Sequence, residues 1–179
     1  IAERLQGDGL NVKGYHLFNL LGHLSAALCL FFLLLGVFSR AQAGALSGLC
    51  AFTIALLWVL HPLHTAALDH VSYRTETLAA LFYLLTFLAA DRSLAEGGGK
   101  IGWGIVSVLA CALGMASKEV MVSAPLIILL WDRAAHSRSL GEAIRRHWRL
   151  HLALFSTWAV LLWSLSLGGR GASVGFGVQ

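Results

Sequence analysis

The feature that most constrains this chain is a series of long apolar stretches that contain no charged residue. The first covers residues 14–39 and the second residues 41–68. A helix needs about 20 mostly apolar residues to cross the hydrocarbon core of a bilayer. The stretches are continuous, whereas transmembrane β-strands alternate apolar and polar side chains. We therefore expect an all-α fold, a polytopic helical membrane protein.

The overall composition supports the same class of protein. Hydrophobic residues make up 58% of the chain and charged residues 12%, and the mean hydropathy is +0.74. Soluble domains carry roughly a quarter charged residues, so a disordered chain and an ordinary soluble domain are both excluded. The net charge is +4, but the basic residues adjoin apolar runs and form no surface with interleaved aromatic residues. We therefore expect membrane lipid and no nucleic acid among the partners.

Six membrane-crossing segments are predicted, at about residues 14–38, 44–61, 75–91, 101–117, 119–132 and 149–168. They form a membrane helical domain over residues 14–169, between the end of an outer loop (1–13) and the start of an outer segment (170–179). Pro62 is predicted to end the second helix, because proline cannot continue a helix. Residues 140–148 are predicted to form a short interfacial helix. We expect the chain to be a fragment of a longer membrane protein that extends at both ends.

Lysine and arginine are distributed unevenly between the two sides of the predicted bundle. Three loops, at residues 39–43, 92–100 and 132–149, hold most of them: Arg40, Arg92, Lys100, Arg133, Arg138, Arg145, Arg146 and Arg149. Cytoplasmic loops carry an excess of Lys and Arg. We therefore place these loops in the cytoplasm and both chain ends outside. Outside means the periplasm, or the lumen in a eukaryote. The bacterial inner membrane, with periplasmic termini, is the location that fits the resemblance described below.

The first predicted span contains three polar side chains on one helical face. His16, Asn19 and His23 are separated by three and four residues. Polar groups at membrane depth cost free energy unless they are paired, so this face is expected to point into the bundle. Two interpretations remain open: hydrogen bonds to neighbouring helices, or contact with a substrate.

A second polar group follows the second predicted span. Its members are His61, Pro62, His64, Thr65, Asp69, His70, Tyr73, Arg74 and Glu76. Pro62 releases backbone groups that need a cavity or protein partners. A loop that lines a substrate site, a surface loop without chemistry, a metal site on His61 and His64, and an anion clamp around Arg74 all fit this pattern. We assign no metal ligand here.

The third group is the tripeptide Ser117-Lys118-Glu119, between two short predicted spans. Ser117 fits an N-cap and Glu119 the first helical turn, where its charge favours the helix dipole. Lys118 would either extend to the membrane surface or meet a phosphate as a point charge.

Several other polar residues receive a structural interpretation. Trp131, Asp132 and Arg133 fit an interfacial aromatic anchor beside an ion pair of sequence neighbours. Three histidines are expected at the interface without a functional role: His136, His147 and His151. Three cysteines are expected to be small buried hydrophobic residues: Cys29, Cys50 and Cys111.

Three segments of the chain, in the order in which they occur, resemble the sequences of a known family. They read GYHLFNLLGHL (14–24), HPLHTAALDHVSYRTETLAALFYLL (61–85) and SKEVMVSAPLIILLWD (117–132). Together they resemble the membrane part of bacterial transmembrane-and-TPR proteins, the relatives of O-mannosyltransferases, whose membrane domain is similar to GT-C glycosyltransferases. The resemblance extends from Gly14 to about Leu167.

The resemblance implies an enzyme that transfers a sugar, with mannose as a candidate, from a polyprenyl-phosphate or dolichyl-phosphate donor. The acceptor would be a protein or glycan hydroxyl on the outer face. The catalytic acid is expected before Ile1, and TPR repeats are expected after Gln179. Many relatives carry an acid where this chain has Ala66, so no catalytic residue is assigned within the loop that follows His61. The fragment is not expected to be active by itself.

Eight residues are the candidates for substrate binding: His16, Asn19, His61, His64, Arg74, Glu76, Lys118 and Glu119. Lys118 and Arg74 are cations on different spans that could meet at a lipid phosphate. No cofactor is assigned beyond the lipid-linked sugar donor, and a divalent metal is left open. Two alternatives of another class remain, a histidine-rich transporter or metal-handling protein and a non-catalytic membrane anchor for TPR repeats.

Overall fold

All secondary structure is helical in the computed structural model, which describes residues 12–41, 44–61, 74–95 and 100–166. The helices are α1 (Val12–Arg40), α2 (Leu46–Leu60), α4 (Arg74–Leu94), α5 (Lys100–Ser117), the 3₁₀ helix η4 (Glu119–Ser123), α6 (Ala124–Ala135), α7 (Leu140–Ser156) and α8 (Trp158–Ser166). The predicted all-α fold is therefore confirmed. The expected outer segment at 170–179 and the candidate His64 lie outside the described residues.

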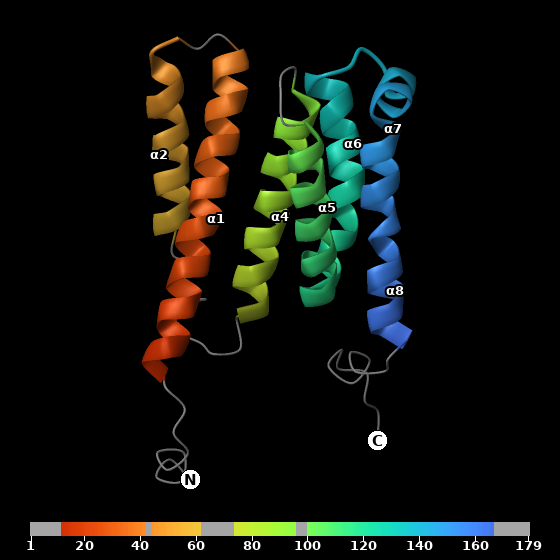
Figure 1. The fold of residues 1–179 in the computed structure, drawn as a ribbon. Helices are drawn as coiled ribbons and strands as arrows, with labels where there is room; N and C mark the ends of the chain where they lie inside the picture. Colours follow the sequence, from red (N-terminus) through yellow and green to blue (C-terminus); the bar gives the residue numbers. More distant parts are fainter. Residues whose placement is uncertain (1–11, 42–43, 62–73, 96–99, 167–179) are drawn as a thin grey trace.

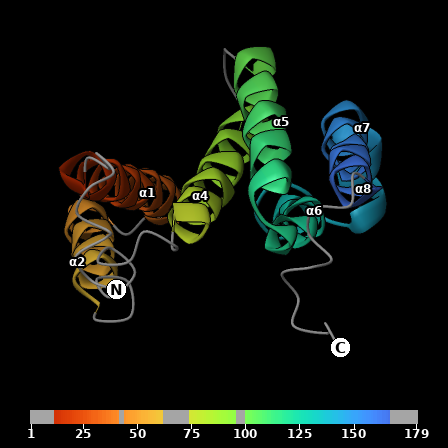
Figure 2. The same cartoon turned by 90° about the horizontal axis from the view of Figure 1, so that it is seen from below.

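The long helices stand side by side and alternate in direction (Figure 1). Helix α1 contacts α2 and α4, α4 contacts α5, and α6 contacts α7. Helix α4 also contacts α6, and α5 contacts α7 and α8, so these helices form one bundle with α1 and α2 beside it (Figure 2). Several helices keep a broad side that no other described helix covers.

The first two helices are separated by five residues and end close to where the sequence indicates. Helix α1 has 29 residues, which corresponds to a length of about 43 Å. Gly44 has a φ of 58°, a conformation that glycine adopts without steric cost. Helix α2 ends at Leu60, and His61 has an extended backbone (φ −65°, ψ 129°). This conformation is typical of a residue that precedes proline, so Pro62 explains the end of α2.

Helix α4 continues to Leu94, beyond the charged residues that suggest an end near residue 91. Asp91 lies inside the helix because Arg40 donates two hydrogen bonds to its carboxylate, of 2.7 and 3.0 Å. Small side chains let α4 lie close to α5: Ala89 and Ala90 are fully buried. Ser107 on α5 also donates to the backbone oxygen of Thr86 (2.9 Å).

The principal hydrophobic cluster lies between α4, α5, η4, α6, α7 and α8. Its buried members are Ala90, Cys111, Met115, Met121, Ala124, Ile128, Leu154 and Leu161. Cys111 is buried as expected, whereas Cys50 is exposed and Cys29 is half-buried. The expected burial of all three cysteines is therefore wrong for Cys50, because no described helix covers that side of α2.

Helix α7 consists of two parts that meet at a kink. His147 has non-helical backbone angles (φ −119°, ψ 25°). The first part begins at Ser139, whose hydroxyl accepts a hydrogen bond from the amide of Glu142 (3.2 Å). It lies across one end of the bundle, and the second part descends along α6 (Figure 1). The predicted interfacial helix at residues 140–148 coincides with this first part.

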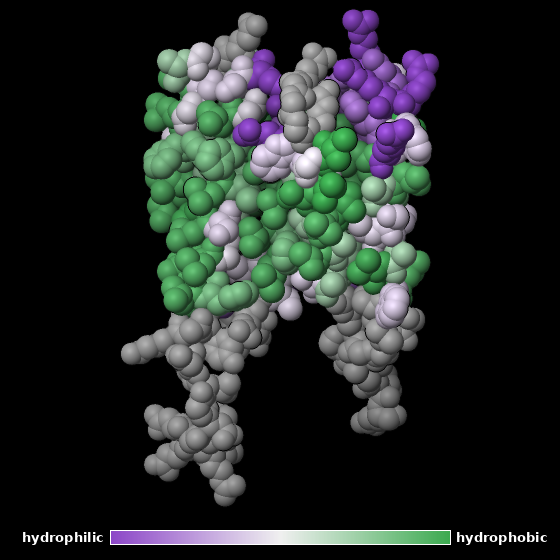
Figure 3. All heavy atoms as spheres, viewed as in Figure 1, coloured by the Kyte–Doolittle hydropathy of each residue, from purple (hydrophilic) through white to green (hydrophobic). Residues whose placement is uncertain are grey.

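On the face shown in Figure 3, a belt of large apolar side chains crosses the middle of the bundle. On α1, α2 and α5 the belt includes Leu28, Phe32, Leu49, Phe52, Leu57, Ile105, Leu109 and Leu113. Soluble monomers rarely expose an apolar patch larger than a few hundred Å². Among the described residues, two helices are long and apolar enough to cross a membrane, Leu17–Arg40 and Thr75–Leu94. The belt is the surface that faces lipid in a helical membrane protein.

Candidate functional site

The alternating directions of the helices bring the three predicted polar groups to the same end of the bundle. The start of α1, the end of α2, the start of α4 and the junction of α5 with η4 all lie there (Figure 1). We call this the Glu76–Lys118 end. The opposite end carries the first part of α7 and its arginines, and we call it the arginine-rich end (Figure 3).

Glu76 and Lys118 form an ion pair between two helices. Glu76 lies in the first turn of α4. Lys118 leaves α5 with an extended backbone (φ −156°, ψ 144°), and its Nζ donates to Glu76 Oε1. The Lys118 side chain is 32% exposed and that of Glu76 is 49% exposed. Exposed ion pairs contribute about 0–1 kcal/mol to stability, so the fold does not depend on this pair.

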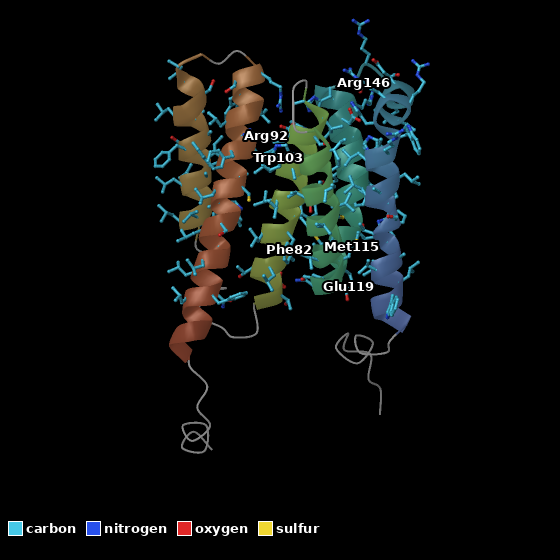
Figure 4. All side chains as sticks on the ribbon, in the orientation of Figure 1. Phe82, Arg92, Trp103, Met115, Glu119 and Arg146 are labelled. Atoms are coloured by element: carbon cyan, nitrogen blue, oxygen red, sulfur yellow. The ribbon has the colours of Figure 1, made fainter. Side chains whose placement is uncertain are left out.

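Ser117 does not have the predicted capping role. It is the last residue of α5, and its hydroxyl donates back to the carbonyl oxygen of Leu113 (2.9 Å). Lys118 occupies the N-cap position of η4, with no hydrogen bond from its side chain to the helix. Glu119, the first residue of η4, is exposed at the Glu76–Lys118 end (Figure 4). The N-cap prediction for Ser117 is therefore wrong, because a carbonyl of its own helix is closer to its hydroxyl.

On α1, Asn19 and His23 have different surroundings. His23 donates to the backbone oxygen of Val59 (3.2 Å) and stacks on the ring of Trp58 (4.9 Å between centroids). It therefore packs α1 against α2, as the packing interpretation predicts. Asn19 is 1% exposed, and its Oδ1 has no hydrogen-bond partner in the described part of the chain. His16 lies in α1, but its side chain is outside the described set.

The structure describes only the two ends of the second polar group. His61 is exposed at the end of α2, and its amide donates to the carbonyl oxygen of Trp58 (3.4 Å). Arg74 begins α4, two residues before Glu76, and its side chain lies outside the described set. Of the eight candidates, the structure thus brings Glu76 and Lys118 into contact and places Asn19, His61 and Glu119 at the same end.

Packing around the ion pair holds its two helices in place. The hydroxyl of Tyr83 on α4 lies 3.1 Å from Ser123 Oγ on η4, and Ser123 donates to the carbonyl oxygen of Val120 (2.9 Å). A Cβ added at Gly22 of α1 would lie 3.0 Å from the methyl group of Thr77. Helix α4 is therefore held between α1 and η4 close to Glu76.

Asp91 is the centre of a polar cluster that the sequence does not reveal. Its carboxylate accepts hydrogen bonds from Arg40 (2.7 and 3.0 Å), Trp131 Nε1 (2.8 Å) and His136 Nε2 (3.1 Å). The Asp91 side chain is 1% exposed and that of His136 is 8% exposed. Asp91 therefore connects α1, α4 and α6.

Asp132 is the centre of a second cluster, between α6 and α7. One of its oxygens accepts from His147 Nδ1 (2.9 Å) and His151 Nε2 (2.8 Å), and the other accepts from Ser137 (3.0 Å). The side chain of Asp132 is fully buried, whereas Arg133 is exposed. The predicted ion pair of sequence neighbours is therefore wrong, because consecutive residues point to different sides of a helix.

The three histidines expected at the interface, His136, His147 and His151, all bind these buried carboxylates and so have a structural role that the sequence did not indicate. That they have no functional role stays a prediction. The spacing of four between His147 and His151 is the signal that indicates a shared face of one helix. Over the described ranges, no group of three or more His, Cys, Asp and Glu residues is placed to hold a metal ion.

The apolar belt, the two long apolar helices and the polar clusters at both ends define a helical membrane protein. Comparison with known proteins narrows this class. The chain is 31% identical to human protein O-mannosyl-transferase TMTC2 over 170 residues, which cover 90% of this chain and 19% of that protein. It is 32% identical to mouse protein O-mannosyl-transferase TMTC4 over 127 residues (62% of this chain, 17% of the relative).

A third relative, Drosophila melanogaster protein O-mannosyl-transferase Tmtc3, is 36% identical over 100 residues (48% of this chain, 11% of the relative). The chain is thus homologous to the TMTC protein O-mannosyl-transferases, and the resemblance inferred from its three segments is confirmed. The chain spans less than a fifth of the length of these relatives. No family model matches the chain, and no solved structure matches it.

Proposed function

We propose that this chain is part of a membrane glycosyltransferase that moves a sugar, with mannose as the leading candidate, from a polyprenyl-phosphate donor to a protein or glycan hydroxyl. The observation that carries the proposal is the similarity to human protein O-mannosyl-transferase TMTC2 over 90% of the chain. The transferase activity, the donor and the acceptor belong to the whole protein. A GT-C-like architecture is part of the proposal.

The reaction needs two kinds of groups at the reacting atoms. The acceptor oxygen forms a bond to the anomeric carbon, the bond from that carbon to the phosphate oxygen breaks, and the polyprenyl phosphate leaves with the electron pair. A base takes the proton of the acceptor hydroxyl, and a cation stabilises the leaving phosphate. We expect the base to be a carboxylate outside residues 1–179.

Lys118 is the candidate for the cation, because it is partly exposed and lies outside the packed part of α5. Glu76 holds its ammonium group at the start of α4. Arg74, the first residue of the same helix, is the second candidate cation. Asn19 remains a candidate for contact with the sugar, because its buried carbonyl oxygen is unpaired among the described residues. His16, His61, His64 and Glu119 complete the proposed substrate-binding set.

The proposal places the Glu76–Lys118 end on the outer side of the membrane and the arginine-rich end in the cytoplasm, since cytoplasmic loops carry the excess of Lys and Arg. In a bacterium the outer side is the periplasm of the inner membrane. Both ends of this chain would lie on that side.

The test is sugar transfer by the purified whole protein of which this chain is part, in lipid nanodiscs, from polyprenyl-phosphate mannose to an acceptor peptide. Lys118→Ala is expected to lower kcat/KM about 100- to 1,000-fold, because the loss of one group that stabilises transition-state charge typically lowers the rate by this factor. Lys118→Arg is expected to restore part of the rate. Arg133→Ala, at the opposite end of the bundle, is the matched control and should leave the rate unchanged.

Two outcomes would contradict the proposal. Wild-type transfer by a well-folded Lys118→Ala variant would remove the role of Lys118. The second outcome is that the wild-type protein transfers no sugar but transports an ion or solute when it is reconstituted into liposomes. That result would favour the transporter alternative.

A further inference from the structure

The arginine-rich end contains a groove between α5 and α7, at the end of α4. Its volume is about 720 Å³, within the range of roughly 300–1,000 Å³ typical of small-molecule sites. Its walls are mainly apolar and include Ile105, Leu109, Leu150 and Ala153. Ile105 and Leu109 belong to the exposed apolar belt, with exposed fractions of 55% and 58%. The groove is therefore continuous with the surface that faces lipid.

Three arginines of α7 also line this groove. Arg145 and Arg146 precede the kink at His147 and Arg149 follows it. All three are exposed, and the guanidinium of Arg149 lies 5.6 Å from the centroid of the Trp148 ring. Figure 3 shows a hydrophilic surface at the arginine-rich end directly next to the apolar belt, and Figure 4 places Arg146 at this end. The lining of the groove thus combines apolar side chains with the three arginines of α7.

The described residues that line the groove include no carboxylate. No described residue of the lining therefore neutralises the charge of Arg145 or Arg149. A ligand that matches both parts carries a phosphate for the guanidinium groups and a hydrocarbon chain for the apolar walls. We propose that this groove binds one anionic phospholipid of the surrounding bilayer, with its phosphate at Arg145 and Arg149 and an acyl chain along α5.

The site is independent of the proposed transferase reaction. It lies at the end of the bundle opposite Glu76 and Lys118. The lipid would hold the first part of α7 on the membrane surface, since the arginines on both sides of the kink contact the same phosphate. The test is a binding measurement and does not require activity.

The experiment measures lipid binding to the detergent-purified chain by native mass spectrometry, with dioleoyl phosphatidylglycerol and dioleoyl phosphatidylcholine as probes. Phosphatidylglycerol is expected to bind with one-to-one stoichiometry and more tightly than phosphatidylcholine. Arg145→Gln combined with Arg149→Gln should weaken phosphatidylglycerol about fivefold per arginine. The control combines Arg133→Gln with Arg138→Gln, which removes the same charge outside the groove, and its affinity should change less than twofold. Equal binding of both lipids, or equal loss in the control, would overturn the proposal.

A second pair of variants tests the acyl chain. Leu109→Trp fills the groove and should abolish the tight phosphatidylglycerol complex. Leu113→Trp lies one turn further along α5, is equally exposed and does not line the groove, so it should bind like the wild type. Retained binding by Leu109→Trp would overturn the placement of the chain. Displacement of the lipid by inorganic phosphate at millimolar concentration would show a headgroup site only, and would overturn the proposal as well.

Discussion

At the scale of single residues, burial separates two kinds of charged group in this protein. Asp91 and Asp132 are buried and each accepts at least three hydrogen bonds. Glu76 and Lys118 are partly exposed and pair with each other. A buried carboxylate without partners costs several kcal/mol, so the partners of the two aspartates are required by the fold. The exposed pair carries no such requirement and remains accessible to a substrate.

The first prediction concerns Asp132. Asp132→Ala is expected to destabilise the protein by roughly 3 kcal/mol, because it leaves His147, His151 and Ser137 without their common acceptor. For a chain of this length such a loss lowers Tm by about 6–12 °C. Circular dichroism during heating in detergent measures this change.

The neighbouring residue provides the control for this prediction. Arg133 is exposed, and Arg133→Ala should change Tm by less than about 2 °C, as surface substitutions usually do. Equal Tm values for both variants would contradict the role given to the Asp132 cluster.

At the scale of helices, the break between α5 and η4 determines how the core closes at the Glu76–Lys118 end. The chain leaves α5 at Lys118, and η4 brings Met121 back over Gly114. A Cβ built on Gly114 would lie 2.4 Å from Met121 Cε and 2.9 Å from its Cγ. Met121 is fully buried, so its side chain has little space to move. Glycine at position 114 is therefore required by a close approach.

The second prediction follows from this contact. Gly114→Ala is expected to destabilise the protein by about 1–3 kcal/mol, the usual cost of overpacking a core. Combining it with Met121→Ala should cost less than the sum of the two single changes, because the second removes the clash. Thermal unfolding of the four proteins measures this coupling.

Gly102 is the matched control on the same helix. A Cβ there meets no atom within 4 Å, so Gly102→Ala should be neutral or stabilise the helix by about 0.5–1 kcal/mol. A similar loss of stability for both glycine variants would contradict the role given to the contact between Gly114 and Met121.

At the scale of the whole molecule, an apolar belt separates two chemically different ends (Figure 3). One end has the Glu76–Lys118 pair, and the other has the arginines of α7 and the two aspartate clusters. This arrangement requires that the helices alternate in direction, as Figure 1 shows. It gives the protein one polar end for the proposed transfer reaction and another for the proposed lipid contact.

The third prediction concerns the orientation of the two ends in the membrane. Glu119→Cys and Arg138→Cys are made separately in a Cys50→Ser background, because Cys50 is exposed. In intact cells a membrane-impermeant maleimide should label Glu119→Cys, whereas Arg138→Cys should react only after permeabilisation. The reverse pattern would contradict the proposed sidedness, and the Cys50→Ser protein alone measures the background.

Much of the fold could be predicted from local sequence. The all-α class follows from the length of the apolar stretches, and the end of α2 follows from Pro62. The first part of α7 follows from its polar and apolar pattern, although the kink at His147 does not. Part of the candidate site was also predictable, because Glu76 and Lys118 lie in segments that resemble the transferase family.

The sequence by itself determined which segments are helical, where α2 ends and which end of the bundle carries the positive charge, because each of these properties depends on neighbouring residues. Only the tertiary structure decided which side chains meet. Glu76 binds Lys118 across 42 positions and Arg40 binds Asp91 across 51. Such contacts depend on the lateral order of the helices, and an apolar stretch fits equally well beside several neighbours. The partners of Asp132 were missed for the same reason, since they depend on how α7 bends back over α6.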